Sequence, residues 1–247
     1  LATPSGYSSI EVFHGSSSGF NGTPDRTMVS NMQGRLLGHA LAITDDVDGD
    51  GCADLLVSEP LNGTSAYNGG RLWLWRGAAT LASTPAWTKD GAANDRLGLV
   101  LKPAGDVDGD GLEDMLVGSA GGASQPGRLH LFFGDSAGYA ADSQVLRTGG
   151  LQQRAGAMLA SGFDSDGDGL EEIASSIRGP GSGSAAWSLN VEVMERIDWE
   201  TLTFPLDHQP RSITLNTALR GETSIVVVEG MDSGGNGTKA TLIEHTL

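Results

Sequence analysis

The stretch Asp46-Val-Asp-Gly-Asp-Gly-Cys-Ala-Asp54 occurs in three versions and decides the fold. It returns as Asp106-Val-Asp-Gly-Asp-Gly-Leu-Glu-Asp114 and as Asp164-Ser-Asp-Gly-Asp-Gly-Leu-Glu-Glu172. Each version places carboxylates at loop positions 1, 3, 5 and 9 and glycine at position 6. Like charges on alternate residues of a tight turn repel one another, so the pattern predicts a bound cation.

A hard divalent ion suits these loops, because Ca²⁺ takes about six to eight oxygen ligands from carboxylates, carbonyls and water. Glycine at position 6 permits the sharp turn that lets position 7 offer its carbonyl. An EF-hand would also need a bidentate Glu at position 12, where this chain has Val57, Val117 and Ser175. A single version could be a solvated acidic turn, but three versions in register favour metal loops. Short apolar or β-branched runs follow each loop, so we predict Ca²⁺ loops that join two β-strands.

The loops mark an internal repeat, because their first aspartates are 60 and 58 residues apart. Each period is predicted to hold a strand before the loop, a strand after it, a third beyond a Gly-rich connection and a weaker fourth. Four antiparallel strands per period of this length are typical of a β-propeller blade, so the predicted fold is an all-β propeller. The expected first strands are 35–43, 96–104 and 154–162, and the expected third strands are 71–77, 128–134 and 188–195.

The chain as a whole, 1–247, is predicted to form a single propeller region of about four blades. Its last part has 219–223 in place of a metal loop, although 232–236 is an alternative, decayed fourth loop. The predicted divisions are part of a preceding blade (8–34), three blades with a Ca²⁺ site (35–95, 96–153 and 154–207) and a degenerate blade without one (208–247).

Composition narrows the function classes. The net charge of −16 argues against nucleic acid as a partner, and three divalent ions would reduce it to about −10. The single cysteine, Cys52, excludes an internal disulfide and lies at loop position 7, where only its carbonyl matters. No apolar run reaches the roughly 18 residues of a membrane span, so no direct membrane insertion is expected. Because Leu1 is not an initiator Met, we expect a processed or excised piece.

The combination "LGHAL … DVDGDGCADLLVSEP … GGRLWLWRG" resembles the FG-GAP repeat of integrin α-chain β-propellers and their bacterial relatives. The Phe-Gly element of that family appears here as Leu37-Gly38, Leu97-Gly98 and Ala155-Gly156. The resemblance covers about residues 8–196, and its metal loops are the specific part. Propellers of this family usually have seven blades, so a longer parent or a second chain is expected to complete the ring, since bare edge strands promote aggregation.

The resemblance also implies the ligands of about three Ca²⁺ ions, with the residue at position 7 contributing its carbonyl. Glu172 departs from the family's Asp in the third loop. The implied ligands are Asp46, Asp48, Asp50, Cys52 and Asp54; Asp106, Asp108, Asp110, Leu112 and Asp114; and Asp164, Asp166, Asp168, Leu170 and Glu172.

No catalytic residue is predicted, because nearly every clustered carboxylate belongs to a metal loop and the histidines show no metal-ligand spacing. His39 and His130 lie at strand positions and are interpreted as packed or surface residues. Trp73 and Trp75 alternate on one strand, which suits packing between blades or stacking on a sugar.

The sequence favours a non-enzymatic, calcium-stabilised adhesion or scaffold module that binds protein. Such a module would be extracellular, at the cell surface or periplasmic. The alternatives are a lectin-like propeller with a carbohydrate ligand and the propeller domain of a secreted enzyme that acts on polysaccharides.

Overall fold

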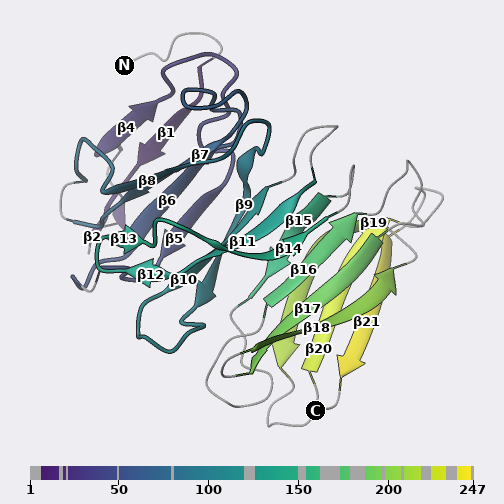
Figure 1. Cartoon of the computed structure of the whole chain (residues 1–247). Helices are drawn as coiled ribbons and strands as arrows, with labels where there is room; N and C mark the ends of the chain where they lie inside the picture. The colour runs from purple at the N-terminus through teal and green to yellow at the C-terminus, as the bar shows by residue number, and fades with distance from the viewer. Residues whose placement is uncertain are drawn as a thin grey trace.

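In the part of the chain that the computed structural model describes, every regular element is a β-strand (Figure 1). Among the described residues, no helix is long and apolar enough to cross a membrane. The structure describes residues 7–16, 19–20, 22–48, 50–78, 81–119, 126–149, 154–161, 173–178, 187–195, 198–206, 209–217, 224–231 and 238–245.

Three four-stranded sheets, each an antiparallel meander, form the main body of the fold. They confirm the predicted four-stranded antiparallel blades of a β-propeller. The first is β5 (Leu41–Thr44), β6 (Asp54–Glu59), β7 (Arg71–Trp75) and β8 (Trp87–Asp90); the second is β9 (Leu97–Gly105), β10 (Asp114–Ser119), β11 (Arg128–Phe132) and β14 (Gln144–Thr148); the third is β15 (Arg154–Ala160), β16 (Ile173–Arg178), β17 (Trp187–Glu195) and β18 (Asp198–Leu206).

Smaller sheets lie at the two ends of the series. A pair of strands, β1 (Ser9–Val12) and β4 (Arg26–Val29), precedes the first four-stranded sheet, and a three-stranded sheet follows the last one. The latter consists of β19 (Gln209–Thr217), β20 (Ser224–Met231) and β21 (Thr238–His245). Two short hairpins were not predicted: β2 (Gly15–Ser16) with β3 (Gly19–Phe20), and β12 (Gly134–Asp135) with β13 (Gly138–Tyr139).

The sheets that begin with β9, β15 and β19 each pack on the preceding sheet through their first strand. β9 contacts β5, β6 and β7, β15 contacts β9, β10 and β11, and β19 contacts β15 and β16. The sheets therefore follow one another side by side in chain order, as Figure 1 shows from the purple to the yellow end. We call the three N-terminal junctions the first seam (β1–β4 pair against β5–β8), the second seam (β5–β8 against β9–β14) and the third seam (β9–β14 against β15–β18).

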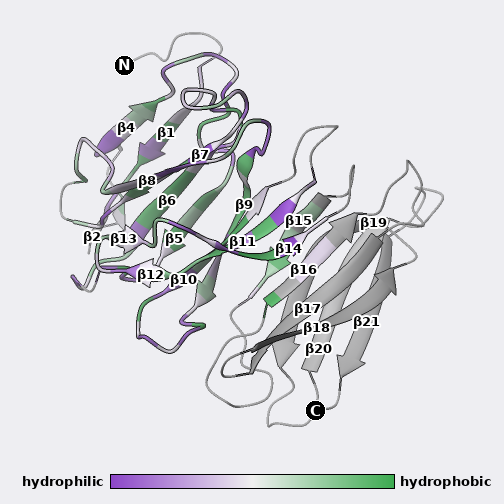
Figure 2. Ribbon diagram, viewed as in Figure 1, coloured by the Kyte–Doolittle hydropathy of each residue, from purple (hydrophilic) through white to green (hydrophobic). Residues whose placement is uncertain are grey.

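The hydrophobic core lies in these seams. Successive side chains of β6 and β10, each the second strand of its sheet, point alternately into the seam before the sheet and the seam after it. On β6, Leu55 and Val57 face the first seam, whereas Leu56 between them faces the second. On β10, Met115 and Val117 face the second seam and Leu116 faces the third. This period of two is what a strand buried on both faces requires, and Figure 2 shows both strands coloured mainly as hydrophobic.

The expected first strand over 35–43 begins later than predicted, at Leu41. Leu36 has a φ of 61°, outside the extended region that a strand residue other than glycine adopts. The N–H of Gly38 instead donates to the carbonyl of Ser58 at 2.9 Å, so the segment turns against the second strand before pairing begins.

Candidate metal centre

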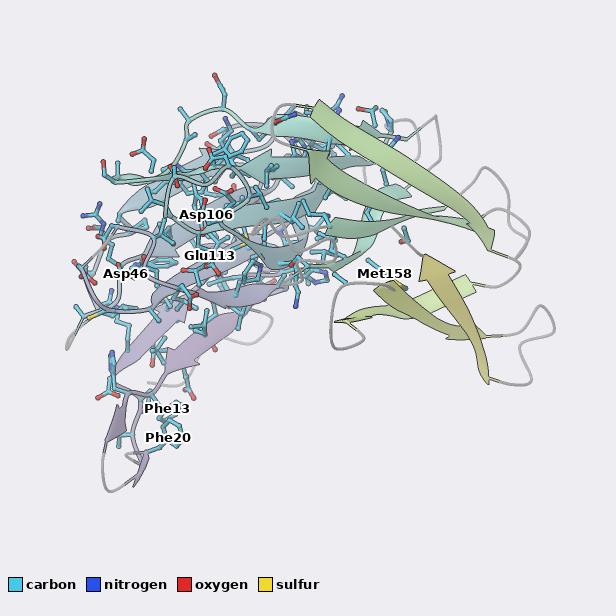
Figure 3. The ribbon with its side chains drawn as sticks, turned by 90° about the horizontal axis from the view of Figure 1, so that it is seen from below. Phe13, Phe20, Asp46, Asp106, Glu113 and Met158 are labelled. Carbon is cyan, nitrogen blue, oxygen red and sulfur yellow. The ribbon has the colours of Figure 1, made fainter. Side chains whose placement is uncertain are left out.

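The first and second acidic loops lie next to one another at the same end of neighbouring sheets. The first loop, Asp46–Asp54, joins β5 to β6, and the second loop, Asp106–Asp114, joins β9 to β10. A pocket of about 430 Å³ between them is lined by Asp45, Asp46, Asp106 and Glu113. Figure 3 shows Asp46, Asp106 and Glu113 gathered on this side of the molecule.

Asp46 organises the first loop through the backbone. Its Oδ1 accepts a hydrogen bond from the N–H of Asp50 at 2.7 Å, and its Oδ2 accepts one from the N–H of Gly51 at 2.5 Å. Oδ1 of Asp48 also accepts from the N–H of Asp50, at 3.2 Å, and Oδ1 of Asp50 accepts from the N–H of Cys52 at 2.8 Å. Gly51 has a φ of 90°, the turn that position 6 was predicted to need.

The second loop repeats this arrangement with its own residues. Asp106 accepts from the N–H groups of Asp110 and Gly111 at 3.0 and 2.7 Å, and Asp110 accepts from the N–H of Leu112 at 2.8 Å. Gly111 also has a φ of 90°. Two stretches of different sequence context therefore adopt one loop geometry, which places carboxylates 1, 3 and 5 around the same turn.

The aspartate at position 9 is buried and ties each loop to its sheet. Asp54 is 0% exposed, and it accepts from the N–H of Val47 at 3.1 Å and from the N–H of Gly77, just beyond β7, at 2.7 Å. Asp114, also 0% exposed, makes the matching bonds to the N–H groups of Val107 at 2.9 Å and of Gly134 at 2.8 Å. A carboxylate has about four acceptor positions, so both groups keep lone pairs for a metal.

Burial raises the pKa of Asp114 to about 7. The hydrogen bonds from Gly134 and Val107 oppose this shift, and the like charges of Asp108 and Asp110 add to it. Burial likewise raises the pKa of Asp54. A buried carboxylate beside other carboxylates is unfavourable in its charged form, and a cation in the loop would remove that cost.

The donor set fits a hard cation. Asp46, Asp48 and Asp50 each bring a carboxylate oxygen within 4.8 Å of the others, and so do Asp106, Asp108 and Asp114. All of these donors are oxygen, the ligand type that Ca²⁺ prefers. The thiol of Cys52 is exposed, and the charge of Asp50 raises its pKa, so it does not contribute as a thiolate.

Not every predicted ligand falls within the described structure. The third predicted loop lies outside the described residues, and so do both candidate segments near the C-terminus, 219–223 and 232–236. The third-loop ligands Asp164, Asp166, Asp168, Leu170 and Glu172 therefore remain sequence predictions.

Sequence reasoning missed two contacts around the loops. Arg76, the residue directly after β7, forms an ion pair between its Nε and Oδ2 of Asp48 at 2.6 Å. Oε2 of Glu113, at position 8 of the second loop, accepts a hydrogen bond from the N–H of Asp45 at 2.7 Å, immediately before the first loop. Neither position is a ligand position, and only the three-dimensional arrangement brings these partners together.

The first loop lies within a segment that matches the model of a known protein repeat. Residues 37–75 match the FG-GAP repeat, and this range includes the first loop, β6 and β7. The chain is 35% identical to integrin alpha-PS2 of Drosophila melanogaster over 160 residues, which cover 57% of this chain and 11% of that protein.

Two further similarities agree with that match. The chain is 37% identical to human integrin alpha-IIb over 119 residues, which cover 44% of this chain and 11% of that protein. It is 31% identical to integrin alpha-5 of Xenopus laevis over 169 residues, which cover 62% of this chain and 16% of that protein. The matched segment thus spans only 11% to 16% of the length of these relatives.

Proposed function

Because this chain carries an FG-GAP repeat and is similar to integrin α chains, we propose that it is a calcium-stabilised propeller module that binds protein outside the cell. The function is adhesion or scaffolding rather than catalysis. The observation that carries the calcium part is the common geometry of the two described loops, in which carboxylates 1, 3 and 5 share a turn and carboxylate 9 is buried beneath it.

In this proposal, Asp46, Asp48, Asp50 and Asp54 hold one Ca²⁺ together with the carbonyl of Cys52. The second ion is held by the corresponding residues of the second loop, Asp106, Asp108, Asp110 and Asp114 with the carbonyl of Leu112. A third ion follows from the sequence of the third loop. The ion supplies positive charge that offsets the repulsion within each loop, so it binds the folded state and stabilises it by linkage.

Thermal unfolding with and without Ca²⁺ tests this role. With a dissociation constant of about 10⁻⁴ M, typical of the tighter extracellular modules, 10 mM Ca²⁺ should add about 2.7 kcal/mol per site to the free energy of unfolding. Removing Ca²⁺ with EDTA should therefore lower the melting temperature by several degrees, and Mg²⁺ should restore less of it. A melt that is unchanged by EDTA would contradict a structural role for calcium.

Site variants assign the ions to their loops. Asp46→Asn and Asp106→Asn each keep the shape of the side chain but remove a ligand charge. Metal analysis should find about three Ca²⁺ in the wild type and one fewer in each variant. The same measurement on Asp164→Asn tests the third loop. An unchanged calcium content in Asp106→Asn would exclude the proposed ligand set.

The proposed protein contact uses apolar residues at the N-terminal end of the sheet series. β1 occupies the place in its sheet that β7 occupies in the next, so Phe13, directly after β1, corresponds to Trp75 at the end of β7. Phe13 is 39% exposed, whereas Trp75 is only 6% exposed. Phe20, the last residue of the hairpin β2–β3, corresponds to Tyr139, the last residue of the hairpin β12–β13. Phe20 is 77% exposed, whereas Tyr139 is only 3% exposed. Figure 3 shows Phe13 and Phe20 near each other, away from the other sheets.

In the following sheets the corresponding residues, Trp75 and Tyr139, are buried in a seam against a neighbouring sheet. The exposure of Phe13 and Phe20 therefore supports the binding of another protein surface at the N-terminal end of the sheet series. Leu41 and Ile43 on β5 add to the exposed apolar area, being 50% and 68% exposed. We propose that a protein partner or second chain covers this face and completes the propeller. Scattered exposed apolar residues are ordinary, but a cluster of this kind marks an interaction site.

The mass of the native particle, isolated from its source in Ca²⁺, tests this contact. A mass above the 25.5 kDa of the chain is expected, and the double variant Phe13→Ser, Phe20→Ser should shift it towards the single chain. A wild-type particle of one chain, with this face accessible to a hydrophobic dye, would contradict the partner. Binding constants for calcium near the extracellular range would support the proposed location outside the cell.

A further inference from the structure

A second candidate site lies in the first seam, away from the calcium loops. It is a pocket of about 400 Å³ between β4 and β7, within the size range of small-ligand sites. Arg26 and Ser30 line it from the β4 side, and Arg71, Trp73 and Trp75 line it from β7. The corresponding position of the second seam is filled by an aromatic side chain.

The two seams differ in the residue at one equivalent position of the repeat. Arg26 pairs with Val12 in the register in which Trp87 pairs with Leu74 one sheet later, so Arg26 occupies the position of Trp87. In the second seam the Trp87 ring fills the space, with ring centroids 5.8 Å from Phe132 and 5.5 Å from Tyr139. In the first seam a guanidinium group replaces this indole, and space remains in front of the tryptophans of β7.

The β7 wall of the pocket is aromatic and held in place. The rings of Trp73 and Trp75 have centroids 6.3 Å apart at an angle of 36°. The guanidinium carbon of Arg71 lies 6.0 Å from the centre of the Trp73 ring. Arg71 is itself fixed, because it donates to Oδ2 of Asp90 at 2.6 Å and to Oγ of Ser65 at 3.1 Å.

The polar groups of the pocket favour a ligand that accepts hydrogen bonds. Its buried carboxylate, Glu59, is already satisfied: it accepts from Oγ of Ser30 at 2.5 Å and from the amide of Asn62. Among the described residues, by contrast, Nε of Arg26 and Nε1 of Trp75 are buried donors without a hydrogen-bond partner, although Nη2 of Arg26 donates to the carbonyl of Ser83 at 3.0 Å. Buried donors are rarely left without a partner, so an acceptor group of a bound ligand or an ordered water would satisfy these two atoms.

We propose that this pocket binds a carboxylate-bearing pyranose, that is, a uronic acid unit of an acidic saccharide. The apolar face of the ring would lie against the indoles of Trp73 and Trp75. The carboxylate and ring hydroxyls would accept from Arg26 and from Nε1 of Trp75. Charge-assisted bonds from a guanidinium group to a carboxylate are among the stronger polar contacts. This site does not depend on the calcium proposal.

Quenching of tryptophan fluorescence by trigalacturonate, in saturating Ca²⁺ and at constant ionic strength, tests the proposal. Arg26→Gln should weaken binding by about tenfold or more, because it removes the charged donor. Arg26→Trp places in the first seam the residue that fills the second, so it should abolish binding while the melting temperature stays near that of the wild type. Lys102→Gln removes a positive charge from exposed β9 and should leave binding unchanged.

Neutral maltotriose should bind at least about tenfold more weakly than trigalacturonate. Equal binding of the two sugars, or no trigalacturonate binding up to about 10 mM, would overturn the proposal. Binding that survives in both Arg26 variants would also overturn it, because the acidic sugar would then be bridging to calcium at the loops. Tighter binding of acetyl-aspartate amide than of methyl glucuronide would assign the pocket to acidic peptides instead. Failure of calcium to raise the melting temperature is a separate result and leaves this test intact.

Discussion

Oε2 of Glu113 lies 2.7 Å from the backbone nitrogen of Asp45 and accepts its hydrogen bond across the second seam. The two residues are 68 positions apart, and each borders a different acidic loop. The second loop thus holds the backbone that leads into the first. Ions bound in the two loops are therefore expected to influence one another.

Replacing Glu113 tests this link. Glu113→Ala should raise the Ca²⁺ concentration at half-saturation of the first loop about threefold to tenfold, because that loop loses a fixed entry point. A fluorophore on Cys52, the single cysteine, reports on the first loop alone. Glu113→Gln keeps an acceptor without the charge and should recover most of the affinity. If both variants weaken binding equally, long-range charge rather than the hydrogen bond couples the loops.

Arg76 should make the first loop the weaker calcium site. Its guanidinium group, paired with Oδ2 of Asp48, competes with a metal ion for that carboxylate, whereas Phe133 holds the corresponding place before Gly134 of the second sheet. Arg76→Phe should raise the affinity of the first loop about twofold to fivefold, the range for a partly exposed ion pair. The fluorophore on Cys52 measures this effect as well. Unchanged affinity would mean that Arg76 moves aside without cost.

Gly98 is predicted to be intolerant of any side chain. Its φ is 91°, and a Cβ there would lie 2.6 Å from Cβ of Ser58 and 2.8 Å from Cδ2 of Leu72. Gly98→Ala should lower the free energy of unfolding by at least about 2 kcal/mol, since backbone strain and a clash in the second seam combine. Urea denaturation in Ca²⁺ measures it. The control is Gly22→Ala, where a Cβ meets nothing within 4 Å; equal losses would refute the packing argument.

His130 should make the fold less stable in acid. Burial, followed by the nearby charges of Arg128 and Lys89, lowers its pKa to about 4. The unfolded chain binds a proton at this site near pH 6.5 and the folded chain does not, so stability falls as the pH drops from about 6.5 to 4. The loss from this residue should reach about 2–3 kcal/mol by pH 4.5.

Comparison of the wild type with His130→Gln isolates this contribution, because the loop carboxylates titrate in both proteins. The difference in free energy of unfolding between the two should shrink between pH 7 and pH 4.5. A difference that stays constant with pH would show that His130 is not buried in its neutral form.

Sequence reasoning predicted the features that depend on local spacing. The glycine at loop position 6 and the carboxylates at positions 1, 3 and 5 adopt the expected turn in both described loops, and the apolar run after the first loop forms the expected strand, β6. What it missed depends on packing between sheets. Glu113 has its partner a whole repeat away, and a single substitution, Arg26 in the place of Trp87, opens a pocket that no local pattern reveals.

The alternation along β6 and β10 also bears on how the molecule comes apart. Because each second strand shares its apolar side chains between the seams on either side, neither sheet has a core of its own. Loss of the sheet β5–β8 would expose Ile10 and Met28 on one side and Leu97 and Phe132 on the other. Unfolding one blade therefore removes packing free energy from both neighbouring blades. These blades are expected to melt as a single cooperative unit and not one after another.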